Sequence, residues 1–117
     1  MNEPDIRTAI PLRRYSLGEF GIVVLGDVDS GNEARYLYVV AVIRQGDDRP
    51  GLYITAEKGA AGQGGEDLIS LRVIMRDGEE VLGSSMEWSD LDAFATEALT
   101  IVSTILDVRD EEPYRLM

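Results

Sequence analysis

Few residues in this chain could carry out chemistry, because the sequence contains neither histidine nor cysteine. Disulfides, thiolate nucleophiles, histidine bases and the usual cysteine and histidine zinc sites are therefore excluded. Lys58 is the single lysine and thus the sole candidate base for a serine nucleophile. No serine stands in a Gly-x-Ser-x-Gly elbow, since the nearest match, residues 83–86, lacks the second glycine. The sequence predicts a protein that is not an enzyme and uses no cofactor.

The stretch GAAGQGGEDL, residues 59–68, has the glycine content of a phosphate-binding loop. Gly59 and Gly64 match the spacing of a Walker loop, but Gly65 and Glu66 stand where lysine and a hydroxyl residue are required. A dinucleotide-binding loop opens a helix, whereas this stretch leads into a predicted strand. We expect residues 59–65 to form a connecting loop without a phosphate.

Acidic residues occur in several short groups that resemble metal sites or acid–base pairs. The stretch DVDSGNE, residues 27–33, has the carboxylate spacing of a calcium loop. However, Asn32 takes the place of the invariant glycine and Tyr38 that of the bidentate glutamate. Neighbours such as Glu79 and Glu80 point to opposite faces of a strand, so adjacency does not make a general acid and base. We expect solvated turns and no metal.

The charge of the chain argues against several partner classes. The net charge of −11 results from 22 acidic and 11 basic residues, so the surface repels phosphate backbones and anionic membranes. The pair Arg13 and Arg14 is expected to neutralise a neighbouring acid. No apolar run approaches the length of a membrane span or signal sequence, and we therefore expect a cytoplasmic protein without nucleic acid or membrane partners.

The elements that must position these residues are five predicted strands and one helix. The strands are expected at residues 19–28, 34–45, 52–58, 67–76 and 79–88. Asp77 and Gly78 predict a hairpin between the last two, which pairs Ile74 with Val81. The core face of that hairpin is then the set Ile69, Leu71, Val73, Met75, Leu82 and Met86. The prediction is a five-stranded antiparallel meander of α+β class.

One amphipathic helix is predicted to pack on one face of this sheet. Ser89 is the expected N-cap, and Asp92 follows it in a near capping box. The apolar face is formed by Leu91, Phe94, Ala98, Ile101, Val102 and Ile105. We expect a loosely ordered N-terminal arm at residues 1–17, a single domain at 18–108 and an acidic tail at 109–117.

The second predicted strand, residues 34–45, is apolar on both faces. Leu37, Val39, Ala41 and Ile43 alternate with Tyr36, Tyr38, Val40 and Val42. A single helix covers one face, so the other requires the N-terminal arm, a curled sheet or a second subunit. Tyrosine and valine make a rigid contact surface. We therefore predict that Tyr36, Tyr38, Val40 and Val42 bind a partner, with a second copy of the chain as the first candidate.

Three functions are compatible with these features. The first is a small acidic protein-interaction module that is not an enzyme, forms a homodimer through the second sheet face and binds another protein in addition. The second is an acidic inhibitor or nucleic-acid mimic that occupies a basic groove of another protein. The third is a binder of a small molecule or divalent metal, with its site between the glycine-rich loop and the helix start around Trp88 and Asp90.

Overall fold

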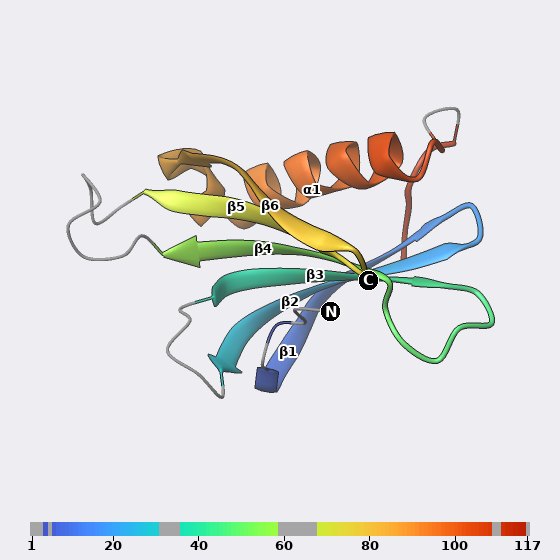
Figure 1. Ribbon diagram of the computed structural model, residues 1–117, viewed down its shortest axis with the longest axis horizontal. Coiled ribbons are helices and arrows are strands. Elements are labelled where there is room, and N and C mark those ends of the chain that lie inside the picture. Colours follow the sequence, from blue (N-terminus) through green and yellow to red (C-terminus); the bar gives the residue numbers. More distant parts are fainter. Residues whose placement is uncertain (1–3, 5, 31–35, 59–67, 109–110, 117) are drawn as a thin grey trace.

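A computed structural model describes residues 4, 6–30, 36–58, 68–108 and 111–116 of the chain. The described part contains a seven-stranded antiparallel sheet with the order β6-β5-β4-β3-β2-β1-β7, and one long helix lies across one face of it (Figure 1). The strands are β1 (Ile6–Leu17), β2 (Phe20–Ser30), β3 (Tyr36–Arg44), β4 (Leu52–Lys58), β5 (Ile69–Met75), β6 (Gly78–Ser85) and β7 (Tyr114–Arg115). A short 3-10 helix, η1 (Met86–Ser89), precedes the α-helix α1 (Leu91–Ile105).

The α+β class and the antiparallel meander of the predicted strands, β2 to β6, are confirmed. The count of five strands is wrong. Residues 6–17, assigned to a loosely ordered arm, form β1, and the C-terminal segment adds β7 beside it. Pro11 and three register shifts interrupt the side-chain alternation of β1, so its sequence lacks the usual period of two. Proline is tolerated there because β1 lies near the edge of the sheet.

The main core lies between α1 and the sheet. Phe94, Ala98 and Val102 of α1 are buried against apolar side chains from both halves of the sheet. These include Leu17 of β1 at one side and Leu71 of β5 at the other, so the open sheet curls around the helix (Figure 1). The prediction that one helix covers one face of the sheet is confirmed.

A second, smaller cluster lies on the face of the sheet away from α1. Its buried members are Val39, Ala41, Tyr53 and Ile74. Partly buried side chains from β1, β2 and β3 pack around them: Ile6, Val23, Leu25, Val28 and Tyr36. Both faces of β3 are therefore packed within the chain itself, which agrees with its apolar sequence.

The β5–β6 hairpin has a different register from the predicted one. Met75 pairs with Gly78, so Arg76 and Asp77 form the turn, and Ile74 pairs with Glu79 instead of Val81. This register lets Arg72 form an ion pair with Glu79 across the hairpin. A bulge follows, because the register shifts by one residue between Leu71 and Arg72.

The bulge alters which residues of the hairpin reach the core. Ile69, Leu71 and Val73 are buried as predicted. Leu82 and Met86 are 45% and 62% exposed, so their assignment to the core is wrong. Leu82 is the extra residue of the bulge, and this leaves an apolar side chain on the open surface beside α1.

The helix starts one residue later than predicted. Ser89 ends η1, and Asp90 is the N-cap of α1, where its carboxylate accepts a hydrogen bond from the Ala93 backbone N–H at 3.0 Å. The serine that caps a helix is Ser85, which accepts a bond from the Glu87 N–H at 3.1 Å at the start of η1. Asp92 makes an ion pair with Arg13 of β1 instead of completing a capping box.

Candidate functional site

The residues predicted to bind a partner do not form one surface. Val40 and Val42 are buried beneath α1 in the main core. The Tyr38 ring stacks on Phe94 of α1 with 5.4 Å between the ring centroids. Its hydroxyl donates a hydrogen bond to the Ser89 carbonyl at 3.3 Å, and burial raises the pKa of this hydroxyl. A partner could reach Val40 and Val42 only by displacing α1, whereas Tyr38 is partly buried against it.

Tyr36 lies on the opposite face of the sheet from Tyr38. The pairing of β3 with β4 shifts by one residue between the two tyrosines, so the alternation that would place both on one face is broken. Tyr36 packs instead against the second cluster, which contains Val39 and Tyr53. The structure thus separates Tyr36 from Tyr38, Val40 and Val42.

An apolar groove of about 610 Å³ lies between the C-terminal half of α1 and the β5–β6 hairpin. Val73, Met75 and Leu82 line it from the sheet, and Ile101 and Ile105 line it from the helix. β6 is exposed along most of its length and pairs with β5 alone among the described residues, so α1 leaves its helix-facing side open here. We refer to this site as the α1–β6 groove.

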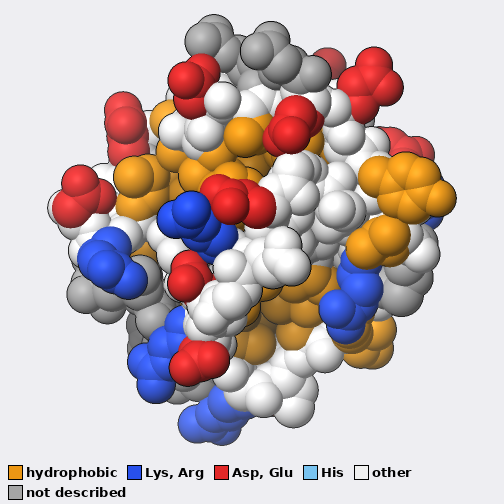
Figure 2. All heavy atoms as spheres, turned by 90° about the vertical axis from the view of Figure 1, so that its right-hand side faces the viewer, with side chains coloured by type: hydrophobic (Ala, Val, Ile, Leu, Met, Phe, Trp, Pro, Cys, Tyr) orange, Lys and Arg blue, Asp and Glu red, His pale blue; other side chains and the backbone are white. Residues whose placement is uncertain are grey.

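A second cavity of about 290 Å³ continues the groove past the end of α1, since Met75 and Ile105 line both. Its other apolar residues are Phe20, Val42, Leu52 and Leu106. Figure 2 views this end of the molecule and shows apolar side chains exposed among acidic and basic side chains. The two cavities together provide an elongated apolar surface with charged margins.

The margin of the α1–β6 groove is acidic. Asp77, Glu79 and Glu80 line it, although the Glu79 carboxylate is directed to Arg72 on the opposite face of the sheet. The adjoining cavity is lined by Asp47 and by Arg44, which is paired with Glu19. Glu79 is paired with Arg72, with 3.2 Å between the charged groups. Among the described residues, no basic side chain lies within ion-pair distance of Asp47, Asp77 or Glu80. These three carboxylates are therefore available to a basic partner.

The groove offers hydroxyl groups that are already engaged. Thr100 and Thr104 line it from α1, and each donates its hydroxyl proton to a helix carbonyl, of Thr96 and Thr100 respectively, at 3.0 Å. Such bonds within a helix leave the hydroxyl oxygen as an acceptor only. The groove is suited to non-covalent contact with apolar and cationic groups.

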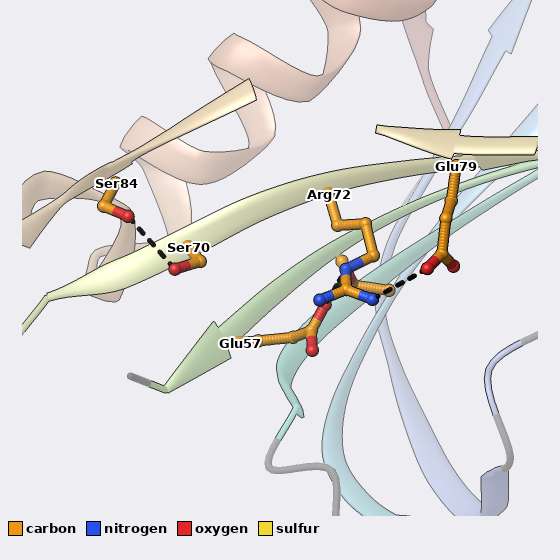
Figure 3. Close-up of polar contacts among 6 residues, drawn as sticks. Glu57, Ser70, Arg72, Glu79 and Ser84 are labelled. Atoms are coloured by element: carbon orange, nitrogen blue, oxygen red, sulfur yellow. Dashed lines mark hydrogen bonds and ion pairs between the residues drawn. The ribbon is translucent and has the colours of Figure 1, made fainter. Parts of the chain in front are cut away.

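A polar network on the opposite face of the sheet connects β6 to its neighbours. Arg72 lies between Glu57 of β4 and Glu79 of β6 (Figure 3). Its Nε is 3.0 Å from a Glu57 oxygen, at ion-pair distance but without the geometry of a hydrogen bond. The Ser70 and Ser84 hydroxyls lie 3.0 Å apart across the hairpin. These contacts position β6 and with it the margin of the groove.

Where the structure describes them, the remaining candidate sites that were predicted from the sequence do not line the α1–β6 groove. Arg13 neutralises a neighbouring acid, as predicted, because it pairs with Asp92; this contact lowers the pKa of Asp92 and raises that of Arg13. Asp90 caps α1, while the glycine-rich stretch at 59–65 and residues 31–33 of the calcium-like stretch lie outside the described residues. Among the described residues, no group of three or more acidic side chains is placed to hold a metal ion.

No protein-family model, curated protein or solved structure matches the chain. Within the described ranges, no helix is both long and apolar enough to cross a membrane. The α1–β6 groove is therefore identified as a candidate site from its geometry alone.

Sequence reasoning did not find this groove. Leu82, Ile101 and Ile105 were all assigned to the core by their spacing, and the bulge at Leu82 depends on how β6 pairs with β5. The one available signal was the pair Glu79 and Glu80 directly before two apolar residues, which is unusual for a buried strand.

Proposed function

We propose that this chain is a protein-interaction module that binds, in the α1–β6 groove, a partner segment carrying both apolar and basic side chains. The observation that supports this most strongly is the combination of an apolar floor with an acidic margin. Leu82 is 45% exposed and Ile105 is 39% exposed, and both line the groove. Covering such side chains stabilises a complex by about 25 cal/mol for each Å² of apolar surface removed from water.

The acidic margin supports a basic partner. Asp47, Asp77 and Glu80 have no ion pair among the described residues, and the whole chain carries a net charge of −11. Charge of one sign around a cleft attracts ligands of the opposite sign and accelerates their association. Arginine and lysine side chains next to the apolar residues of the partner would meet these carboxylates.

The apolar floor of the groove favours a module that binds a peptide segment over a nucleic-acid mimic, which would itself occupy a cationic groove of another protein. A mimic presents its carboxylates as a continuous charged surface, because it replaces a phosphate backbone. In this groove the carboxylates border apolar side chains, and Arg72 neutralises part of the charge of Glu79. The site thus combines apolar and ionic recognition.

The test compares two peptides that share an apolar centre and differ in their flanks, one with arginines and one with glutamates. We expect the arginine-flanked peptide to shift the backbone amide NMR signals of Leu82, Ile101 and Ile105 in the labelled protein, and to bind more weakly as salt screens the carboxylates. Equal binding of both peptides, or shifts confined to other surfaces, would contradict the proposal.

Two variants with matched chemistry locate the contact. Ile105→Arg places a charge in the groove and should weaken binding about tenfold, which corresponds to about 1.4 kcal/mol. Ile10→Arg makes the same change at an exposed isoleucine of β1, on the other side of the sheet, and should leave binding unchanged. The proposal fails if both variants bind the peptide equally well.

A further inference from the structure

The strand that borders the groove is also an edge of the sheet. In the part of the chain that the structure describes, β6 pairs with β5 alone. The backbone N–H and C=O groups on its outer side therefore have no strand partner among the described residues, and such an edge is a template for another strand. Val81 is 54% exposed and lies next to Leu82 at the centre of this edge.

The opposite edge of the sheet, formed by β1 and β7, is better protected against the addition of a strand. There β1 contains Pro11 and three register shifts, and β7 covers it at Tyr15 and Ser16. Proline, bulges and a covering segment are the devices by which proteins block strand addition. β6 contains a single bulge and no proline, so it is the edge that is better suited to accept a strand.

We propose that the partner segment binds as an additional β-strand on the outer edge of β6, with its basic residues beside Glu79 and Glu80 and its apolar residues beside Val81 and Leu82. This inference rests on the proposed function of the α1–β6 groove and specifies how the partner lies in it. In this mode, main-chain hydrogen bonds supply affinity and alternate side chains supply specificity.

The lining of the groove supports this placement. Gly78, Glu80 and Leu82 of β6 form its outer margin, so a strand added there extends the floor of the groove by one strand spacing, about 4.8 Å. Every second side chain of the added strand would then face the side of α1 and lie next to Leu82. The charge of β6 is concentrated at Glu79 and Glu80, whereas its other end carries Ser84 and Ser85. The basic residues of the segment are therefore expected at the end that lies beside Glu79 and Glu80.

A partner of opposite charge fits this edge better than a second copy of the chain. A second copy would bring another net charge of −11 to an edge that is already acidic, and like charges disfavour association. Self-association through β6 is therefore an outcome that would count against the proposal.

The test uses a peptide with arginines at one end and valines alternating with threonines at the other, matched to β6 in length. Single backbone N-methyl groups are placed at successive positions, and each removes one hydrogen-bond donor without changing the side chains. We expect binding to weaken at least tenfold at every second position, where the N–H faces β6. The intervening positions, whose N–H groups face solvent, serve as controls and should bind as the parent peptide does.

The possible outcomes distinguish strand addition on β6 from the proposed binding function of the α1–β6 groove. An N-methyl scan without a period of two, with binding retained in the groove, would overturn strand addition and leave the proposed function in place. Failure of every arginine-bearing peptide to bind would overturn both. Sedimentation equilibrium of the protein alone would also overturn strand addition by a foreign segment if it showed a dimer that Val81→Glu dissociates.

Discussion

Tyr38 contributes to the structure through both its ring and its hydroxyl. The ring stacks on Phe94, which is fully buried, and the hydroxyl donates to the Ser89 carbonyl just before α1 begins. This residue therefore connects β3 to the start of the helix. Its place in the sequence, among alternating tyrosines and valines, led to the prediction of an intermolecular contact, and the structure shows the same chemistry used within the chain.

Substitutions at Tyr38 distinguish a core role from an interface role. Tyr38→Phe keeps the stacked ring and loses one hydrogen bond, so it should cost about 0.5–1.5 kcal/mol of the free energy of unfolding. Tyr38→Glu places a carboxylate against Phe94 and should cost about 3 kcal/mol or more. Urea denaturation followed by circular dichroism measures both. Unchanged stability of the Tyr38→Glu protein, combined with a change in its oligomeric state, would place Tyr38 at an interface instead.

Tyr36 shows the limit of sequence reasoning at the scale of a residue. Alternation predicts correctly that Tyr38, Val40 and Val42 share a face, because the chain is regular there. Tyr36 departs from this pattern since the register shift between Tyr36 and Tyr38 arises from pairing with Ala56 and Glu57 of β4. A shift of this kind depends on a neighbouring strand, so local sequence contains no signal for it.

At the scale of elements, the start of α1 illustrates how a neighbouring element changes a boundary. Ser89 has the right chemistry for an N-cap, but its hydroxyl donates to the Met86 carbonyl at 2.9 Å within η1. Asp90 takes the capping role and accepts from the Ala93 N–H. The two candidates differ by one residue, which is the usual uncertainty of helix ends.

Removal of each side chain should therefore have unequal effects. Asp90→Ala removes the N-cap and should destabilise the protein by about 1 kcal/mol. Ser89→Ala removes a bond that closes a turn of η1 and should cost less. Thermal unfolding of both variants, compared with the unmodified protein, provides the measurement. A greater loss for Ser89→Ala would mean that Ser89, as the sequence first suggested, caps the helix.

Regular elements were predictable from the sequence, and irregular ones were not. The strands β2 to β6 and the helix follow from β-branched runs, turn residues and an apolar helical face. β1 was missed because Pro11 and its register shifts hide the alternation, and β7 because it spans two residues. The groove was missed for the same reason, as it depends on the bulge at Leu82.

At the scale of the whole molecule, charge and shape act at the same place. The chain carries a net charge of −11, and at the end of the molecule shown in Figure 2 charged side chains of both signs border exposed apolar side chains. The Arg72 network holds β6 from the opposite face, so the acidic edge is positioned before a partner arrives (Figure 3). A positioned site loses less conformational entropy on binding than a flexible one.

The central claim is that the carboxylates at the α1–β6 groove select a basic partner segment. A charge-reversed protein, with Asp77→Lys and Glu80→Lys, is compared with a control that carries Asp29→Lys and Glu87→Lys. The control makes the same change in net charge at exposed positions that do not line the groove. Both proteins are titrated by calorimetry, at low salt, with the arginine-flanked and the glutamate-flanked peptides.

We predict that the control protein still prefers the arginine-flanked peptide, whereas the charge-reversed protein prefers the glutamate-flanked peptide, because the local charge at the groove sets the preference. The same order of preference in both proteins would show that net charge, and not the groove, determines binding, and would contradict the account.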